Sequence, residues 1–132
     1  MASTPNFAST PRIGVAAVST ANANRDGTGT IPTVITGVAA GTKIERIVAQ
    51  ATGDPADCTI TLFLHDGANF FLWNEIDLGN PAAASTTLMG AHAEILVRDV
   101  VLPNASWSLR AAITAAPTTG VVNVFAFGAD LT

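Results

Sequence analysis

Cys58, His65 and Asp66 come nearest to a catalytic set in this chain, since they supply a thiol, an imidazole and a carboxylate. A nucleophile needs its base within hydrogen-bond reach. On the strand predicted here, Cys58 and His65 would point to opposite faces and could share a proton only across a bulge. His92 is the other imidazole, and two histidines with one cysteine make a poor set of metal ligands. We therefore expect a buried structural thiol, no catalytic residues, no metal and no cofactor.

Glu75 and Asp77 are paired carboxylates, the arrangement used to cleave glycosidic bonds. That chemistry needs two acids about 5 to 10 Å apart across a cleft. On one strand face these two would lie about 7 Å apart. Nothing near them in the sequence indicates a raised pKa, so a solvated strand face is the better interpretation. A small hydrolase is the least favoured of the function classes considered.

Asp26-Gly27-Thr28-Gly29 resembles a glycine-rich phosphate loop but lacks the lysine and the strand-to-helix context that such loops need. We expect a turn here. Aspartates of this and other loops could donate oxygens to Ca²⁺, which takes six to eight of them, but the spacing is not that of an EF-hand. The aspartates considered are Asp26, Asp54, Asp57 and Asp130.

Trp73 and Trp107 could stack on sugars, although the chain has no tyrosine to extend such a surface. They keep open an alternative function, a carbohydrate- or receptor-binding β-sandwich module.

The charge balance argues against nucleic-acid binding. Six Lys and Arg stand against 10 Asp and Glu, for a net charge of −4, and the cations are scattered along the sequence. Phosphate binding needs them clustered. No apolar run approaches the roughly 20 residues of a membrane span, and the N-terminus lacks the features of a secretory signal. We expect no membrane partner, and the single cysteine fits synthesis in a reducing cytoplasm.

Eight apolar runs separated by Gly, Pro, Asn and Asp predict strands rather than helices. The predicted strands cover about 12–20, 30–36, 43–51, 58–65, 70–78, 92–102, 106–114 and 121–130. Turns at this spacing favour an all-β fold, an antiparallel two-sheet sandwich of jelly-roll or Greek-key type, with a closed barrel as the alternative. We expect a flexible N-terminal arm over 1–11 and a single β-sandwich domain over 12–132.

Alternation along each run predicts which side chains share a face. Cys58 to His65 alternates most clearly, with Ile60 and Leu62 on the face of Cys58. In the third strand, Ile44 and Val48 fall on one side and Ile47 on the other. In the fifth, the shared phase contains Phe70, Leu72, Ile76 and Leu78, with Phe71 and Trp73 opposite.

Several segments resemble small β-rich structural proteins of tailed bacteriophages. They are Asn24–Ile31, Gly41–Ile47, Leu62–Gly67, Glu75-Ile76, Val101–Pro103, Trp107–Ala111 and Val124–Asp130. The resemblance implies a non-enzymatic structural protein of the virion, in the first place a decoration or cement protein on the capsid surface. It implies the major capsid protein as partner and self-association, as a homotrimer or a dimer. The alternative is the carbohydrate- or receptor-binding module, which would belong to a phage tail or fibre, and no residue decides between head and tail.

Cementing would require exposed apolar side chains that contact the shell or sister subunits. The candidates are Phe7 of the N-terminal arm and Phe70, Phe71, Trp73, Phe125 and Phe127 of the sandwich.

Overall fold

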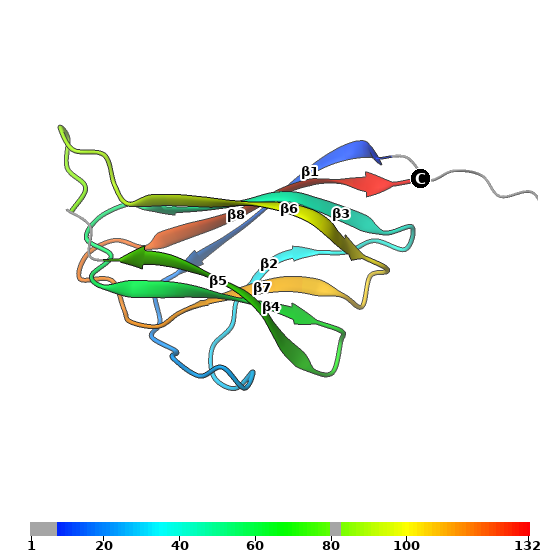
Figure 1. The fold of residues 1–132 in the computed structure, drawn as a ribbon, viewed down its shortest axis with the longest axis horizontal. Helices are drawn as coiled ribbons and strands as arrows, with labels where there is room; N and C mark the ends of the chain where they lie inside the picture. The colour runs from blue at the N-terminus through cyan, green and yellow to red at the C-terminus, as the bar shows by residue number, and fades with distance from the viewer. Residues whose placement is uncertain (1–7, 80–82) are drawn as a thin grey trace, which may run out of the picture.

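Two antiparallel β-sheets packed face to face make up the computed structural model, which describes residues 8–79 and 83–132 (Figure 1). One sheet has the strand order β1-β8-β3-β6 and the other β2-β7-β4-β5. The predicted eight-stranded antiparallel sandwich is confirmed, and the closed barrel is wrong. The strands are β1 (Ala8–Val18), β2 (Thr33–Thr36), β3 (Thr42–Ala51), β4 (Cys58–His65), β5 (Phe70–Gly79), β6 (His92–Leu102), β7 (Ser108–Ile113) and β8 (Val122–Leu131).

Strand β1 begins at Ala8, before its predicted start at Arg12. Ala8 is in register with Leu131, and Pro11 with Ala129. β1 forms an edge of its sheet, where a proline is tolerated because only one side of the strand is paired. Residues 1–7 of the expected arm, including Phe7, lie outside the described residues.

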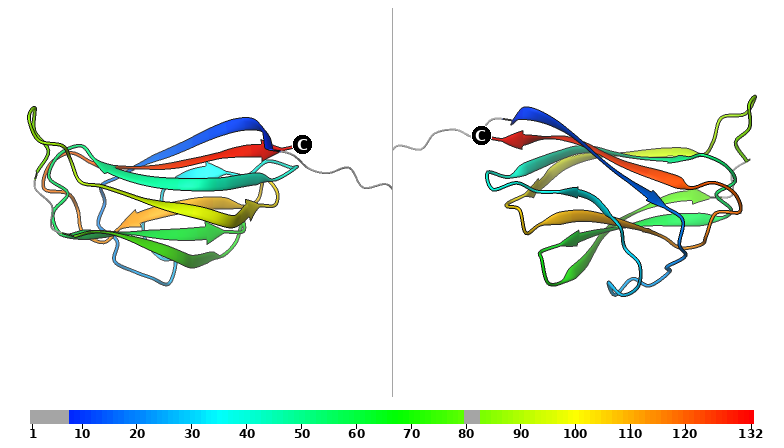
Figure 2. Two further views of the ribbon diagram at one scale, coloured as in Figure 1. Left: turned by 45° about the horizontal axis from the view of Figure 1, so that its top comes forward. Right: turned by 180° about the vertical axis from the view of Figure 1, so that it is seen from behind.

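The strands pair as nested partners along the chain. β4 pairs with β5, β3 with β6, β2 with β7, and β1 with β8, all antiparallel. Only the β4–β5 connection stays within a sheet among the described strands. The four nested pairs form one long antiparallel ribbon. When this ribbon folds back on itself, β3 also pairs with β8, and β4 also pairs with β7. Figure 2 shows the resulting two layers from two further sides.

The core lies between the two sheets, because alternate residues of each strand point inward. Ile60 and Leu62 of β4 are fully buried there, and Cys58 is 3% exposed, so the alternation predicted for this strand is confirmed. Gly14 of β1 lies close against β2 of the facing sheet. A Cβ there would collide with the Val34 carbonyl and the Ile35 side chain.

Bulges change the predicted phase of two strands. Glu45 is an extra residue of β3, since Ile44 is in register with Gly128 and Arg46 with Phe127. Ile44 and Ile47 therefore both enter the core, and the expected separation of the two is wrong. A bulge adds one unpaired residue and so reverses the alternation beyond it.

In β5 the extra residue is Trp73, because Leu72 is in register with Phe63 and Asn74 with Leu62. Ile76 faces the core, whereas Leu72 shares the outer face with Phe63. The predicted common face of Phe70, Leu72, Ile76 and Leu78 is therefore wrong.

The segment between β1 and β2 covers the outer face of the β2-β7-β4-β5 sheet, beneath the lower sheet in Figure 1. Ile31 of this segment packs on Phe63 and Ala112, and Phe63 is fully buried although it points away from the core. The side chain of Asn22 holds the segment in place. Its Nδ2 donates to the carbonyl oxygens of Thr28 at 2.9 Å and Thr30 at 3.0 Å.

Candidate functional site

The thiol and imidazole considered as a catalytic pair lie on opposite faces of β4. Cys58 points into the core, where burial raises the pKa of its thiol, with smaller contributions from the charges of Asp57 and Asp77. The His65 ring lies on the outer face, 4.2 Å from the Phe70 ring centroid. The structure therefore does not bring the two together for proton transfer.

The paired carboxylates each have a local structural role. Glu75 Oε1 accepts a hydrogen bond from Arg25 Nε at 2.7 Å, and Asp77 Oδ1 accepts one from the Gly79 N–H at 2.7 Å. Nothing in these contacts marks either group as a proton donor for catalysis.

Three of the four aspartates considered for calcium accept hydrogen bonds from other residues, Asp26 and Asp54 within their own loops and Asp130 from β1. Hydrogen bonds from the Thr28 hydroxyl and N–H hold the pKa of Asp26 below its ordinary value. Asp54 accepts from the Ala56 N–H at 3.0 Å, and Asp130 binds Arg12. Across residues 8–79 and 83–132, no three His, Cys, Asp or Glu side chains are grouped so that they could hold a metal ion. Over the same residues no helix is long and apolar enough to cross a membrane.

The aromatic candidates divide between the sheets. Trp73 and Trp107 are partly buried against the core, and Phe70 packs edge-on against Phe63 with ring centroids 6.3 Å apart. Phe71 is 48% exposed at the β5 edge. These residues do not form one common surface with Phe125 and Phe127, because those two belong to the other sheet.

Phe125 and Phe127 lie together on the outer face of the β1-β8-β3-β6 sheet, with ring centroids 6.0 Å apart. The strand register aligns two rows of side chains across this face. One row is Ile13, Phe127, Arg46 and Leu96, and the next is Val15, Phe125, Val48 and Glu94. Six of these eight side chains are apolar, so the face forms a continuous apolar surface; we call these eight residues the outer-sheet face.

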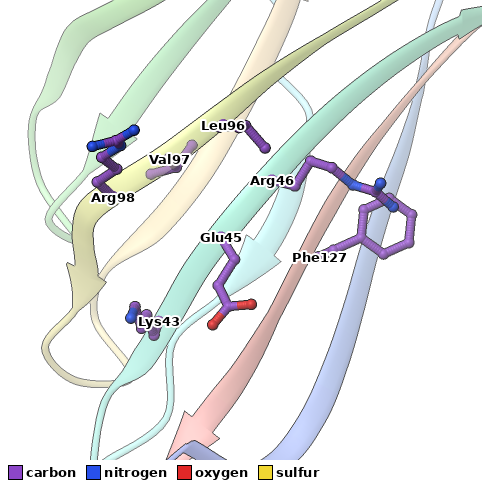
Figure 3. A pocket seen from close by; sticks show the side chains of 7 residues that line it. All are labelled: Lys43, Glu45, Arg46, Leu96, Val97, Arg98 and Phe127. Atoms are coloured by element: carbon purple, nitrogen blue, oxygen red, sulfur yellow. The ribbon is translucent and has the colours of Figure 1, made fainter.

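A shallow groove of about 590 Å³ opens on this face (Figure 3). It lies where the β3–β6 ladder is interrupted, since Ile44 is in register with Val100 and Arg46 with Leu96. Between these two pairs, Glu45 of β3 and residues 97–99 of β6 have no register partner, so the ladder between the two strands is broken there. Three strands line the groove, with Lys43, Glu45 and Arg46 from β3, Leu96, Val97 and Arg98 from β6, and Phe127 from β8.

The groove gathers charges that are scattered in the sequence. Arg46 lies over the Phe127 ring, 4.7 Å from its centroid, and is 3.7 Å from Glu94 Oε2. Within the described part of the chain, Lys43 and Arg98 have no carboxylate at salt-bridge distance. Three of the six Lys and Arg residues therefore line one groove, although the six are scattered along the sequence.

Sequence reasoning named two aromatic residues of this surface and missed the rest. The phase of Ile13 and Val15, which are 67% and 52% exposed, was visible as alternation in β1. No local signal shows that their face is uncovered. The residues not predicted as contacts are Ile13, Val15, Arg46, Val48, Glu94 and Leu96 of the face, with Lys43 and Arg98 of the groove.

The fold and this face define a β-sandwich with an apolar, partly cationic surface. No family model and no curated protein matches the sequence. The structure is similar to a chain in the acidic stable capsid structure of the Helicobacter pylori bacteriophage KHP30. The TM-score is 0.57 at 9% identity, and the match covers 97% of this chain and 95% of that chain. At this identity the comparison establishes a shared fold.

Proposed function

We propose that this protein is a non-enzymatic structural component of a bacteriophage virion, a decoration or cement protein that binds and stabilises the head shell. The observation that carries the proposal is the match to a chain of a phage capsid structure over almost the whole length of both chains. The sequence resemblance to phage structural proteins points the same way, although it was drawn from different features.

The strand pairing supports a jelly roll, a fold that occurs in viral capsid domains. A jelly roll has eight strands in two sheets built from two Greek keys. Nested pairing of β1 with β8 through β4 with β5 is the pairing expected of this arrangement. Such a sandwich is a rigid block that offers its faces and edges to neighbours.

Cementing works through many weak contacts repeated by symmetry. Each copy adds buried interface between shell subunits, and linked copies bind with an avidity that one copy lacks. A homotrimer bound to the major capsid protein on the capsid surface fits this mechanism. The proposed residues for contact with the shell or with sister subunits are Phe7, Phe70, Phe71, Trp73, Phe125 and Phe127.

The test compares virions with and without this protein. We expect particles that lack it to lose thermal and osmotic stability, and the purified protein to restore both when added back. Binding is measured by co-sedimentation with empty shells, and the mass of the purified protein distinguishes trimer from dimer. Unchanged particle stability together with no binding to shells would contradict the proposal.

A further inference from the structure

The two outer faces of the sandwich differ in what covers them. On the β2-β7-β4-β5 sheet the chain itself supplies a cover, with Ile31 over Phe63 and the Gly27 backbone close to the Phe70 side chain. On the β1-β8-β3-β6 sheet no described segment lies over the outer-sheet face, as the upper sheet of Figure 1 shows. Leu96 there is 73% exposed and Ile13 is 67% exposed. Large exposed apolar surface of this kind marks an interaction site.

The charges of the groove indicate the chemistry of its partner. Lys43 and Arg98 have no salt-bridge partner within the described residues. In Figure 3, Arg98 lies beside Val97 on β6 and Lys43 lies on β3 near Glu45. A carboxylate of a partner placed between them would gain charge-assisted hydrogen bonds. Only one of the chain's ten carboxylates, that of Glu45, lines the groove.

We propose that the outer-sheet face and its groove are the surface that docks on the shell, and that its occupant is a capsid-protein segment carrying apolar side chains next to carboxylates. This inference rests on the proposed function and identifies the binding surface and the chemistry of the partner. It also orients the molecule, because the loop-covered sheet then faces away from the shell.

Other occupants fit the groove less well. A phosphate polymer would meet the carboxylates of Glu45 and Glu94 beside every contact with a cation. A second copy packed face to face would enclose two sets of Lys43 and Arg98 in one interface. Glu45 is the only carboxylate among the groove-lining residues of each copy that could compensate them.

The groove carries its own chemical probe, since Lys43 is the only lysine of the chain. A carbodiimide joins amines to carboxylates that touch them. With the protein bound to empty shells of its own virus, we expect a link from Lys43 to an Asp or Glu of the capsid protein, identified by mass spectrometry. We also expect Lys43 to become resistant to acetylation on binding. Lys43→Arg keeps the charge, so it should bind but give no link from this position.

Matched variants test the apolar part of the surface. Leu96→Asp should weaken binding to shells by about tenfold or more, as for a central interface residue. Leu88→Asp is the control, because Leu88 is also an exposed leucine, at 56%, but lies in the loop before β6. The double change Lys43→Glu and Arg98→Glu should also weaken binding, with Arg25→Glu as its control. Thermal melting of each variant confirms that it folds.

The outcomes separate this inference from the proposed function. If the unchanged protein does not bind shells, the proposed function fails and this inference with it. If it binds, but Leu96→Asp and the double variant bind equally well and Lys43 stays reactive, the surface is wrong and the function stands. Links from Lys43 only to another copy of this chain, detected by mixing isotopically labelled and unlabelled protein, would overturn the capsid-protein occupant.

Discussion

Arg46 and Phe127 are register partners on β3 and β8, and the Arg46 guanidinium lies 4.7 Å from the centre of the Phe127 ring. The same guanidinium reaches Glu94 on β6 at 3.7 Å. One side chain thus spans three strands and shields an aromatic ring while its charge stays in water. This contact reduces the apolar surface that the protein exposes before it meets a partner.

Replacing Arg46 with alanine tests this shielding. Cation–π contacts and ion pairs at exposed sites are weak, so Arg46→Ala should lower the free energy of unfolding by less than about 1.5 kcal/mol. The uncovered ring should increase self-association, measured by light scattering over a range of protein concentrations. Arg25→Ala, which removes an exposed ion pair with Glu75, should leave self-association unchanged. Equal behaviour of the two variants would show that Arg46 shields nothing.

Phe63 tests the cover over the other sheet. Its ring is fully buried beneath the segment before β2, so Phe63→Ala should cost about 3 to 5 kcal/mol of unfolding free energy. Phe71→Ala removes the same group from a side chain that is 48% exposed and should cost far less. Urea unfolding of both variants measures the difference. Similar losses would mean that the segment does not pack on Phe63 in solution.

The side chain of Asp130 on β8 connects this strand to β1 and β3. Its Oδ1 accepts hydrogen bonds from Arg12 Nη1 at 2.9 Å and from the buried Thr42 hydroxyl at 2.8 Å. Asp130→Ala leaves both donors without this acceptor and should cost about 1 to 3 kcal/mol. Glu75→Ala breaks an exposed ion pair and should cost at most about 1 kcal/mol. Thermal melts of the two variants rank the costs, and the reverse order would refute this account.

Cys58 should make stability depend on pH in the alkaline range. Burial raises the pKa of its thiol, so the native state holds the proton more tightly than the unfolded chain. The resulting stabilisation is complete below the unfolded pKa of about 8.5 and is lost as the pH rises through the folded pKa. Between pH 7 and 10 the unchanged protein should therefore lose more unfolding free energy than Cys58→Ala.

The two proteins are compared by urea unfolding at each pH, so that effects of other groups cancel. The thiol should also stay unreactive toward an aromatic disulfide reagent until the protein unfolds, because it is 3% exposed. Fast labelling of the native protein, or parallel pH profiles, would contradict a buried thiol.

Local alternation was enough to predict the strands, because the pleat makes every second residue face the same way. It succeeded at Cys58–His65, where Ile60 and Leu62 enter the core. It failed in β3 and β5, where Glu45 and Trp73 are extra residues that shift the register. A bulge depends on the neighbouring strand, so the sequence of one strand does not show it.

The candidate site was predicted only in part for a similar reason. Phe125 and Phe127 were predicted as contact residues, and their alternation within one strand places them on the same face. Lys43, Arg98 and Leu96 belong to segments about fifty residues apart, and only the pairing of β3 with β6 brings them to one groove.

The amino-acid sequence alone determined the all-β class, the number of strands and the buried thiol, because these follow from the periodicity and polarity of neighbouring residues. The tertiary structure alone decided which outer face is covered and which charges meet. Phe63 and Leu96 are both large apolar residues on outward-facing strand positions, yet one is fully buried and the other is 73% exposed. The difference arises because the segment between β1 and β2 crosses the outer face that contains Phe63, whereas no described segment crosses the outer face that contains Leu96.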